Sequence, residues 1–534
     1  MAFVITQSCC NDASCVPECP VDCIRPTPED PEFVDAEMLY IDPDTCIDCG
    51  ACVDACPVDA IFAEDELSAK HAPYAQINAD WFTRHPLETN PNPLSPHVQP
   101  PAALGTLRVA IVGSGPAACY AADELLTRRN VEVEMFERLP APWGLVRYGV
   151  SPDHPATRGV VDEFAFKGNQ FAFHLNVEVG KHVSHDELLE HHHAVIYAVG
   201  AATDRQLGIP GEDRPLSHSA TEFVAWYNGH PDYADRRFDL SGPRAVVVGN
   251  GNVALDVARI LTTPPDELAR TDIADHALEA LRHSGIREVV VLGRRGPVQA
   301  AYTSTEFLAL GRRDGVDVVV DAAELAPVPA DAEPSLALKV QLAHDYAQRT
   351  PTGERRIVFR YNRSPVEIHD GGITVVRNEL VAVHGRVEAR PTADTETIDT
   401  TLVLRSVGYR GTPVPGLPFD DAAGVVPNDH GRVAPRVYVT GWIKRGPRGF
   451  IGTNRACAEE TVDNLLDDFV AGKLDQPPHG RAELNELLTA RQPERITRAQ
   501  WQAIDRAERE RGKAQRRPRV KFVSVAELVQ AGRS

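Results

Sequence analysis

Long apolar runs are absent from this 534-residue chain, and basic residues are scarce relative to acidic ones. No run of 18 apolar residues occurs, so no membrane-spanning helix is predicted. The N-terminus lacks the basic start and apolar stretch of a secretory signal, which favours a location in the cytoplasm. The net charge is −21, whereas binding to a phosphate backbone demands Lys and Arg. We therefore expect neither membrane insertion nor nucleic-acid binding.

Cysteine is nearly missing from most of the chain, because nine of the eleven cysteines lie within the first 56 residues. Residues 1–66 also contain sixteen Asp or Glu but a single base, Arg25. In a chain without an export signal, clustered cysteines are more often metal ligands than disulfides. A small, acidic, metal-binding module is therefore predicted to precede a larger module of nearly balanced charge.

A proline-rich stretch separates the two modules. Residues 86–101 contain six prolines and little apolar periodicity, which predicts an extended spacer or a long surface loop. Beyond it, β-branched runs alternate with helical segments, a pattern typical of parallel sheets with helices on both faces. The predicted strands are residues 107–112, 131–137, 194–200, 244–248, 287–293, 401–408 and 436–442.

The spacing of four cysteines is specific for iron–sulfur proteins: Cys46-x2-Cys49-x2-Cys52-x3-Cys56-Pro57. In such a run the first three thiolates bind one cluster and the fourth serves another. ECPVDCI (18–24) and ACPVDAI (55–61) match at five of seven positions, so Cys19 is predicted to be the reciprocal fourth ligand. A zinc ribbon would prefer two separated cysteine pairs. The predicted ligands of a 4Fe–4S cluster are Cys19, Cys46, Cys49 and Cys52.

The second cluster is left with Cys9, Cys15 and Cys56, and three ligands suit a 3Fe–4S cluster. Here residues 2–66 resemble seven-iron bacterial ferredoxins, with AFVIT, CPVDCI, MLYI and CIDCGAC in matching places. The gap between Cys9 and Cys15 is shorter than that family usually has. Cys10 could therefore replace Cys9, or help to hold a fourth iron and so complete a second 4Fe–4S cluster.

Two glycine turns each follow a predicted strand and open a predicted helix. In Gly113-x-Gly115-x-x-Ala118 the first glycine makes a tight turn and the second lets a pyrophosphate approach the helix N-terminus. Glu137, which ends the next strand, suits a ribose hydroxyl. The second turn, Gly249-x-Gly251-x-x-Ala254, is followed by a strand that ends in two arginines, 294 and 295. Guanidinium groups bind a 2′-phosphate that an acid would repel, which indicates NADP rather than NAD.

With both turns in place, residues 106–534 resemble adrenodoxin-reductase-like ferredoxin–NADP reductases. The matching stretches are GSGPAA, PWGLVR, SPDHP, NVEVG, GNGNVALDVAR, GRRGP, SVGYRG and GWIKRGPRGFIGTN. The resemblance implies FAD contacts, together with the first turn, at Gly113, Gly115, Ala117, Glu137, Leu145, Val179, Trp442, Gly449, Phe450 and Ile451. It implies NADP contacts at Gly251, Asn252, Val253, Ala254, Arg294, Arg295, Glu306 and Gly449. His154, within SPDHP, is expected near the flavin or as a hydrogen-bonded structural histidine, and no side chain is required as an essential catalyst.

The predicted fold is an α/β flavoprotein with two Rossmann-like, parallel-sheet dinucleotide-binding domains, preceded by a small α+β ferredoxin-like iron–sulfur domain. The predicted domains are residues 1–66 (ferredoxin-like), 67–105 (proline-rich linker), 106–204 (FAD-binding, first part), 205–404 (NADP-binding) and 405–534 (FAD-binding, second part, with the C-terminal tail).

The resemblances imply a ferredoxin–NADP reductase with a fused ferredoxin. NADPH would give a hydride to FAD, and single electrons would pass through the clusters to a ferredoxin or another one-electron redox protein. Hydride transfer needs only the two nucleotide folds, so we expect the fused module to leave its rate unchanged. One alternative is the electron-input subunit of a larger enzyme, such as the small subunit of glutamate synthase. Another is a sensing module whose clusters report redox state without turnover.

Overall fold

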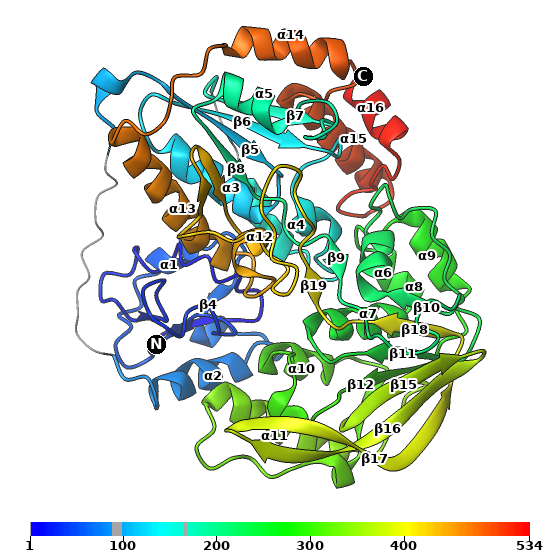
Figure 1. The fold of residues 1–534 in the computed structure, drawn as a ribbon. Coiled ribbons are helices and arrows are strands. Elements are labelled where there is room, and N and C mark those ends of the chain that lie inside the picture. The colour runs from blue at the N-terminus through cyan, green and yellow to red at the C-terminus, as the bar shows by residue number, and fades with distance from the viewer. Residues whose placement is uncertain (1, 88–98, 165, 167, 534) are drawn as a thin grey trace.

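The computed structural model describes residues 2–87, 99–164, 166 and 168–533. Two six-stranded sheets form the centres of two domains, and the N-terminal module packs beside both of them (Figure 1). Within the described part of the chain, no helix is long and apolar enough to cross a membrane.

The first domain holds a sheet in which five of the six strands are parallel. In spatial order its strands are β20 (Arg432–Ala434), β21 (Val437–Val439), β8 (Ala194–Tyr197), β5 (Leu107–Val112), β6 (Val131–Glu137) and β7 (Phe171–Leu175). Strand β5 reads LRVAIV and is buried at every position except Arg108, as expected for a strand covered on both faces. Its covering helices include α3 (Pro116–Leu126), α13 (Thr453–Val470), α15 (Arg498–Ala514) and α16 (Val525–Gly532).

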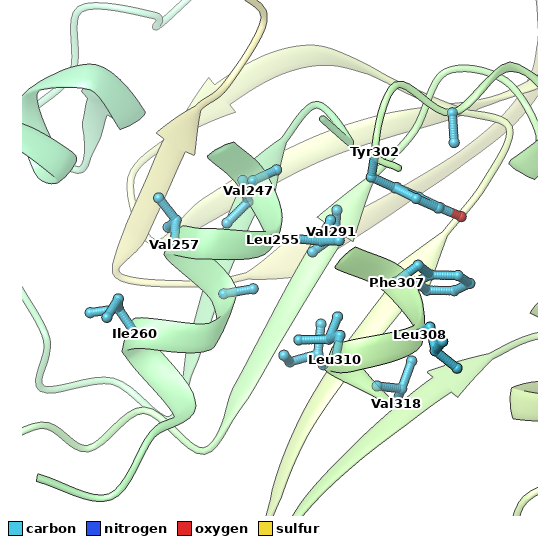
Figure 2. Close-up of a cluster of buried hydrophobic side chains, with 14 of the residues drawn as sticks. Val247, Leu255, Val257, Ile260, Val291, Tyr302, Phe307, Leu308, Leu310 and Val318 are labelled. Atoms are coloured by element: carbon cyan, nitrogen blue, oxygen red, sulfur yellow. The ribbon is translucent and has the colours of Figure 1, made fainter. Parts of the chain in front are cut away.

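The second domain holds an entirely parallel sheet. In spatial order its strands are β10 (Ser217–Ser219), β18 (Leu402–Arg405), β11 (Arg244–Val248), β12 (Glu288–Leu292), β14 (Arg355–Arg360) and β13 (Val316–Val320). Its helices include α6 (Ala220–Tyr227), α7 (Asn252–Thr262), α10 (Ser304–Leu310) and α11 (Pro334–Ala347). Figure 2 shows the core, in which apolar side chains of α7 and α10 meet those of the sheet.

An antiparallel sheet that the sequence analysis did not predict is appended to the second domain. Its strands are β15 (Arg363–His369), β16 (Gly372–Val383) and β17 (Arg386–Asp399).

The other α-helices described in the two domains are α4 (Gly144–Tyr148), α5 (His185–His191), α8 (Pro265–Leu268), α9 (Asp275–Arg282), α12 (Trp442–Arg445) and α14 (Arg481–Arg491).

The chain passes between the two domains at two adjacent points. Strands β9 (Thr203–Asp204) and β19 (Tyr409–Arg410) pair antiparallel where the chain leaves the first domain and returns to it. These crossings lie close to the predicted limits at residues 204 and 405.

The N-terminal module is built from short strands around the cysteines. Its strands are β1 (Phe3–Ile5), β2 (Ile24–Arg25), β3 (Tyr40–Ile41) and β4 (Ile61–Ala63), and its helices are α1 (Ala51–Asp54) and α2 (Pro73–Phe82). Strand β1 pairs with β4 and β2 pairs with β3, both antiparallel. The first and last strands of the module therefore meet in one ribbon.

Helix α2 corrects the prediction that residues 67–105 form a linker, because it belongs to the module. Its buried side chains Tyr74, Asn78 and Trp81 follow helical spacing. The Asn78 amide oxygen accepts hydrogen bonds from the backbone N–H groups of Ile5 (3.2 Å) and Ile41 (2.9 Å), so it links β1 to β3. Most of the proline-rich stretch, residues 88–98, lies outside the described residues.

Candidate cofactor and nucleotide site

A cavity of about 1960 Å³ lies where the two domains and the N-terminal module meet. Both glycine turns form part of its wall, and so does His154. Every residue predicted to contact FAD lines it, as does every predicted NADP contact except Ala254. Ala254 is fully buried in the core, which suits the helix–strand packing role of the third position in such a turn.

The first glycine turn has the shape that a pyrophosphate needs. Gly113 has φ +106°, and a Cβ there would lie 2.4 Å from the Ala198 carbonyl oxygen, so only glycine fits. Helix α3 begins after Gly115, and no described side chain caps its first turn, which leaves backbone N–H groups for an anion. Glu137 ends β6, and its carboxylate accepts hydrogen bonds from Ser114 Oγ (2.7 Å) and the Leu139 N–H (3.0 Å). Burial raises the pKa of Glu137 above its ordinary value.

The second glycine turn repeats this geometry. Gly249 has φ +113°, and a Cβ there would lie 2.0 Å from the Ser406 carbonyl oxygen. Helix α7 begins after Gly251, again without a side-chain cap among the residues described. Arg294 and Arg295 follow β12 at the cavity wall, and Arg295 Nη1 donates to the Val387 carbonyl oxygen (3.4 Å). The residues present therefore fit FAD at the first turn and a phosphorylated dinucleotide at the second.

A buried charge network that the sequence analysis missed links α7 to the loop that carries His154 and to α10. Arg259 of α7 is only 4% exposed, and it donates to Asp153 (Nε to Oδ2, 2.6 Å), to Glu306 (Nη1 to Oε2, 3.1 Å) and to His154 Nε2. Burial opposes ionisation of Asp153, but Arg259 outweighs it and holds the pKa of that carboxyl well below its usual range. The sequence does contain one feature that points to this network. Asp256 and Arg259 lie one turn apart on a mostly apolar helix, where two charged side chains need partners.

The first cysteine set is arranged as one cluster site. Cys19, Cys46, Cys49 and Cys52 surround a single small void. Cys23 lies beside them, and its backbone N–H donates to Cys19 Sγ (3.4 Å). Hydrogen bonds from the Cys23 side chain and backbone lower the pKa of the Cys19 thiol, which favours the thiolate that iron requires. Cys49 is exposed, so this set lies near solvent.

The second cysteine set reaches the cavity through Cys9. Burial raises the pKa values of Cys9, Cys15 and Cys56, and the sulfur of Cys56 acts electrostatically on both of the others. The Ala60 N–H donates to Cys56 Sγ (3.3 Å). Cys9 lines the cavity, and Cys9 and Cys56 contact the apolar cores of both the module and the first domain. The donor chemistry fits a second iron–sulfur cluster at this position.

The loop that carries Cys9 packs directly against Gly452, which follows the predicted FAD contacts Phe450 and Ile451 in the chain. The Gly452 N–H donates to the Cys10 carbonyl oxygen (2.7 Å), and a Cβ on Gly452 would lie 2.1 Å from the Asp12 nitrogen. Arg455 Nη1 donates to Ser14 Oγ (2.6 Å). The module is therefore docked at the mouth of the flavin site.

Comparisons with known proteins agree with this division of the chain. A family model described as a 4Fe-4S binding domain matches residues 39–62, and one described as pyridine nucleotide-disulphide oxidoreductase matches residues 107–295. A solved structure described as Mycobacterium tuberculosis FprA in complex with NADPH has a TM-score of 0.78 and 50% sequence identity, covering 80% of this chain and all of that one.

Some curated relatives match the whole chain, and others match the reductase part alone. A protein described as probable ferredoxin/ferredoxin–NADP reductase of Mycobacterium bovis is 49% identical over 100% of this chain and 95% of its own length. The NADPH-ferredoxin reductase FprA of Mycobacterium tuberculosis is 51% identical over 79% of this chain and 98% of its own length. The full-length match favours the fused reductase over a glutamate-synthase-type subunit. The chain thus belongs to the FAD-dependent ferredoxin–NADP reductases that carry a fused iron–sulfur ferredoxin domain.

Proposed function

We propose that electrons cross this protein in a fixed spatial order. They would enter from NADPH and pass to a cluster held by Cys9, Cys15 and Cys56, of which Cys9 lines the cavity. A cluster held by the solvent-facing set (Cys19, Cys46, Cys49 and Cys52) would receive them next. FAD, when bound, accepts the hydride as an electron pair, and iron–sulfur clusters carry electrons singly. The contact of Gly452 with the Cys10–Asp12 loop supports this proposal, because that loop lies between Cys9 and Cys15 and Gly452 follows the predicted FAD contacts Phe450 and Ile451.

The nucleotide contacts follow from the two glycine turns. The uncapped start of α3 would hold the FAD pyrophosphate, with Glu137 on the ribose, and the FAD-contact residues predicted above would line the rest. The start of α7 would hold the NADP pyrophosphate, with Arg294 and Arg295 on the 2′-phosphate. Gly449 lines the cavity, where it would serve both nucleotides.

We propose a 3Fe–4S cluster on the second cysteine set, with Cys9 as a ligand. Cys10 packs into the core of the first domain, whereas Cys9 packs against both cores, including the one that contains Cys15, and this supports the choice. Paramagnetic resonance of the protein as purified should show the signal of an oxidised 3Fe cluster. Two intact 4Fe–4S clusters after anaerobic purification would contradict this assignment.

The external acceptor is proposed to be a ferredoxin or another one-electron redox protein that meets the solvent-facing set. Cys49 is exposed, and the neighbouring Ile47 keeps 58% of its surface accessible. Electron tunnelling needs close approach, so an acceptor should dock at this edge of the module.

Ligand variants test the order of the two sets. In Cys49→Ser, NADPH should still reduce the second cluster in anaerobic stopped-flow mixing, while electron delivery to an added ferredoxin should fall. In Cys56→Ser, both should fall, while reduction of ferricyanide by the flavin should continue. Cys457→Ser, outside the module, is the control for loss of a thiol, and iron analysis checks which cluster each variant retains. Normal reduction of an added ferredoxin by Cys56→Ser, with the second cluster gone, would refute the proposed order.

A further inference from the structure

The ferredoxin module contributes a side chain to the wall of the nucleotide cavity. Gln7 lines that cavity, and its amide nitrogen donates to Glu306 Oε1 (2.9 Å). The backbone before it is fixed, because the N–H and hydroxyl of the fully buried Thr6 both donate to the Ala60 carbonyl oxygen (2.8 and 2.9 Å). Gln7 therefore reaches across the interface from a rigid part of the module.

Glu306 is held from three directions. Its Oε2 accepts from Arg259 (3.1 Å), its backbone N–H donates to Thr303 Oγ1 (3.2 Å), and its Oε1 accepts from Gln7. Burial opposes its ionisation, yet the charges of His154 and Arg259 and the hydrogen bond from Gln7 hold the pKa of Glu306 below its ordinary value. The carboxylate is therefore kept charged and oriented, and Gln7 is its only partner that comes from the module among the described residues.

A second contact from the module fixes the first turn of α10, which contains Glu306. The Glu37 carboxylate accepts hydrogen bonds from the Ser304 N–H (2.8 Å) and hydroxyl. The preceding residue, Thr303, donates its N–H to Asn252 Oδ1 (2.9 Å), and Asn252 begins α7. The first turn of α10 is thus held between the module and the helix that the second glycine turn opens.

The rest of α10 is anchored in the core of the second domain. Phe307 and Leu310 are fully buried, and Figure 2 shows them among the apolar side chains of the sheet. The contacts of Gln7 and Glu37 are made to the first turn of the helix, where Thr303, Thr305 and Glu306 line the cavity. In Figure 1 the module lies beside α10 along this edge.

We propose that Gln7 is a positioning residue for NADPH oxidation: with Glu37, it holds Glu306 and the first turn of α10 in the arrangement that receives the nicotinamide nucleotide. The fused ferredoxin then completes the NADPH site as well as accepting electrons. This inference rests on the proposed placement of Glu306 in that site. It replaces the sequence-based expectation that the module leaves hydride transfer unchanged.

The test uses Gln7→Leu in the full chain with its cofactors, and NADPH oxidation with ferricyanide as the acceptor. A lost hydrogen bond to a partly exposed charged group corresponds to an effect of about tenfold. We expect kcat/KM for NADPH to fall about tenfold and the dissociation constant of NADP⁺, measured by calorimetry, to rise. Amide hydrogen exchange across residues 303–310 should become faster, while flavin and iron contents stay normal.

Three comparisons make the result decisive. Arg84→Gln removes another contact between module and second domain, in which Arg84 donates to the carbonyl oxygens of Asp331 and Ala332 (2.8 and 2.7 Å). That variant should keep normal kcat/KM. Gln7→Leu should add little loss to Glu306→Gln, because Glu306→Gln already removes the charged carboxylate that Gln7 is proposed to hold. Full additivity of those two changes, an equal loss in Arg84→Gln, or unchanged NADP⁺ affinity in Gln7→Leu would each overturn the inference.

The Glu306→Gln and Gln7→Leu variants also separate failure of this inference from failure of the proposed function. If Glu306→Gln leaves NADP⁺ affinity and turnover unchanged, then Glu306 is not part of the NADP site and both fail. If Glu306→Gln impairs both and Gln7→Leu impairs neither, only the role of Gln7 is refuted.

Discussion

The choice between NADPH and NADH should depend on Arg294 and Arg295, the two arginines that follow β12 at the cavity wall. Only NADPH carries the 2′-phosphate that two guanidiniums would bind. Replacing both with Gln removes this charge while keeping polar side chains of similar reach. The kcat/KM for NADPH should therefore fall far more than the kcat/KM for NADH.

The magnitude follows from the exposure of the two side chains. A hydrogen bond to a charged group contributes about 1.5–3 kcal/mol, and water screens the exposed Arg294, so about 1.5 kcal/mol is expected there. Arg295 is half-buried and held by the Val387 carbonyl oxygen, so about 2 kcal/mol is reasonable. Together these values correspond to roughly 10²–10³-fold in selectivity, since 1.36 kcal/mol is about tenfold.

The assay is kcat/KM for NADPH divided by kcat/KM for NADH, with ferricyanide as the acceptor. Arg287→Gln is the matched control, because Arg287 is an exposed arginine at the opposite end of β12. That control should leave the ratio unchanged. Equal losses for both nucleotides in the double variant would show that the arginines support the fold rather than the 2′-phosphate.

Three further predictions concern the interface and the core. Gly452→Val should slow reduction of the clusters by NADPH, because a side chain at this position meets the backbone of Asp12. Stopped-flow absorbance measures this rate. An unchanged rate at normal FAD content would show that this contact is not on the electron route. Glu508→Gln should leave the buried Arg147 unpaired and cost about 3–5 kcal/mol, seen as a lower thermal midpoint; an unchanged midpoint would contradict this. Burial opposes ionisation of Glu134, but hydrogen bonds from two buried histidines hold its pKa well below 4.5. The stability it contributes is therefore present above pH 4.5 and lost as the pH falls below that value. The thermal midpoint should drop less steeply below pH 4.5 in Glu134→Gln, and parallel profiles would exclude this role.

The sequence by itself determined the cofactor chemistry of this protein. Cluster ligands from Cys46 to Cys56 lie close together along the chain, so their spacing alone specifies the geometry that iron needs. Each nucleotide turn is likewise a local strand–glycine–helix unit, and the positive φ of its first glycine, Gly113 or Gly249, requires that residue type. Patterns of this kind are readable because the residues that make the site are neighbours in sequence.

Helix α2 and the β15–β17 sheet were not predicted from the sequence, for different physical reasons. The burial of Tyr74, Asn78 and Trp81 at helical spacing marks α2 as part of the module, although its sequence lies next to a proline-rich stretch. The appended β15–β17 sheet carries many exposed polar residues, so it has little of the apolar signal that identifies a core strand.

Only the tertiary structure decided how the module sits on the reductase and which cysteine set faces the flavin site. Gln7 and Glu306 are 299 positions apart, and neither belongs to a pattern that points to the other. The same holds for Gly452 and the loop that carries Cys10. Local sequence encodes local geometry, but contacts of this range depend on the shapes of surfaces that exist only after each domain has folded.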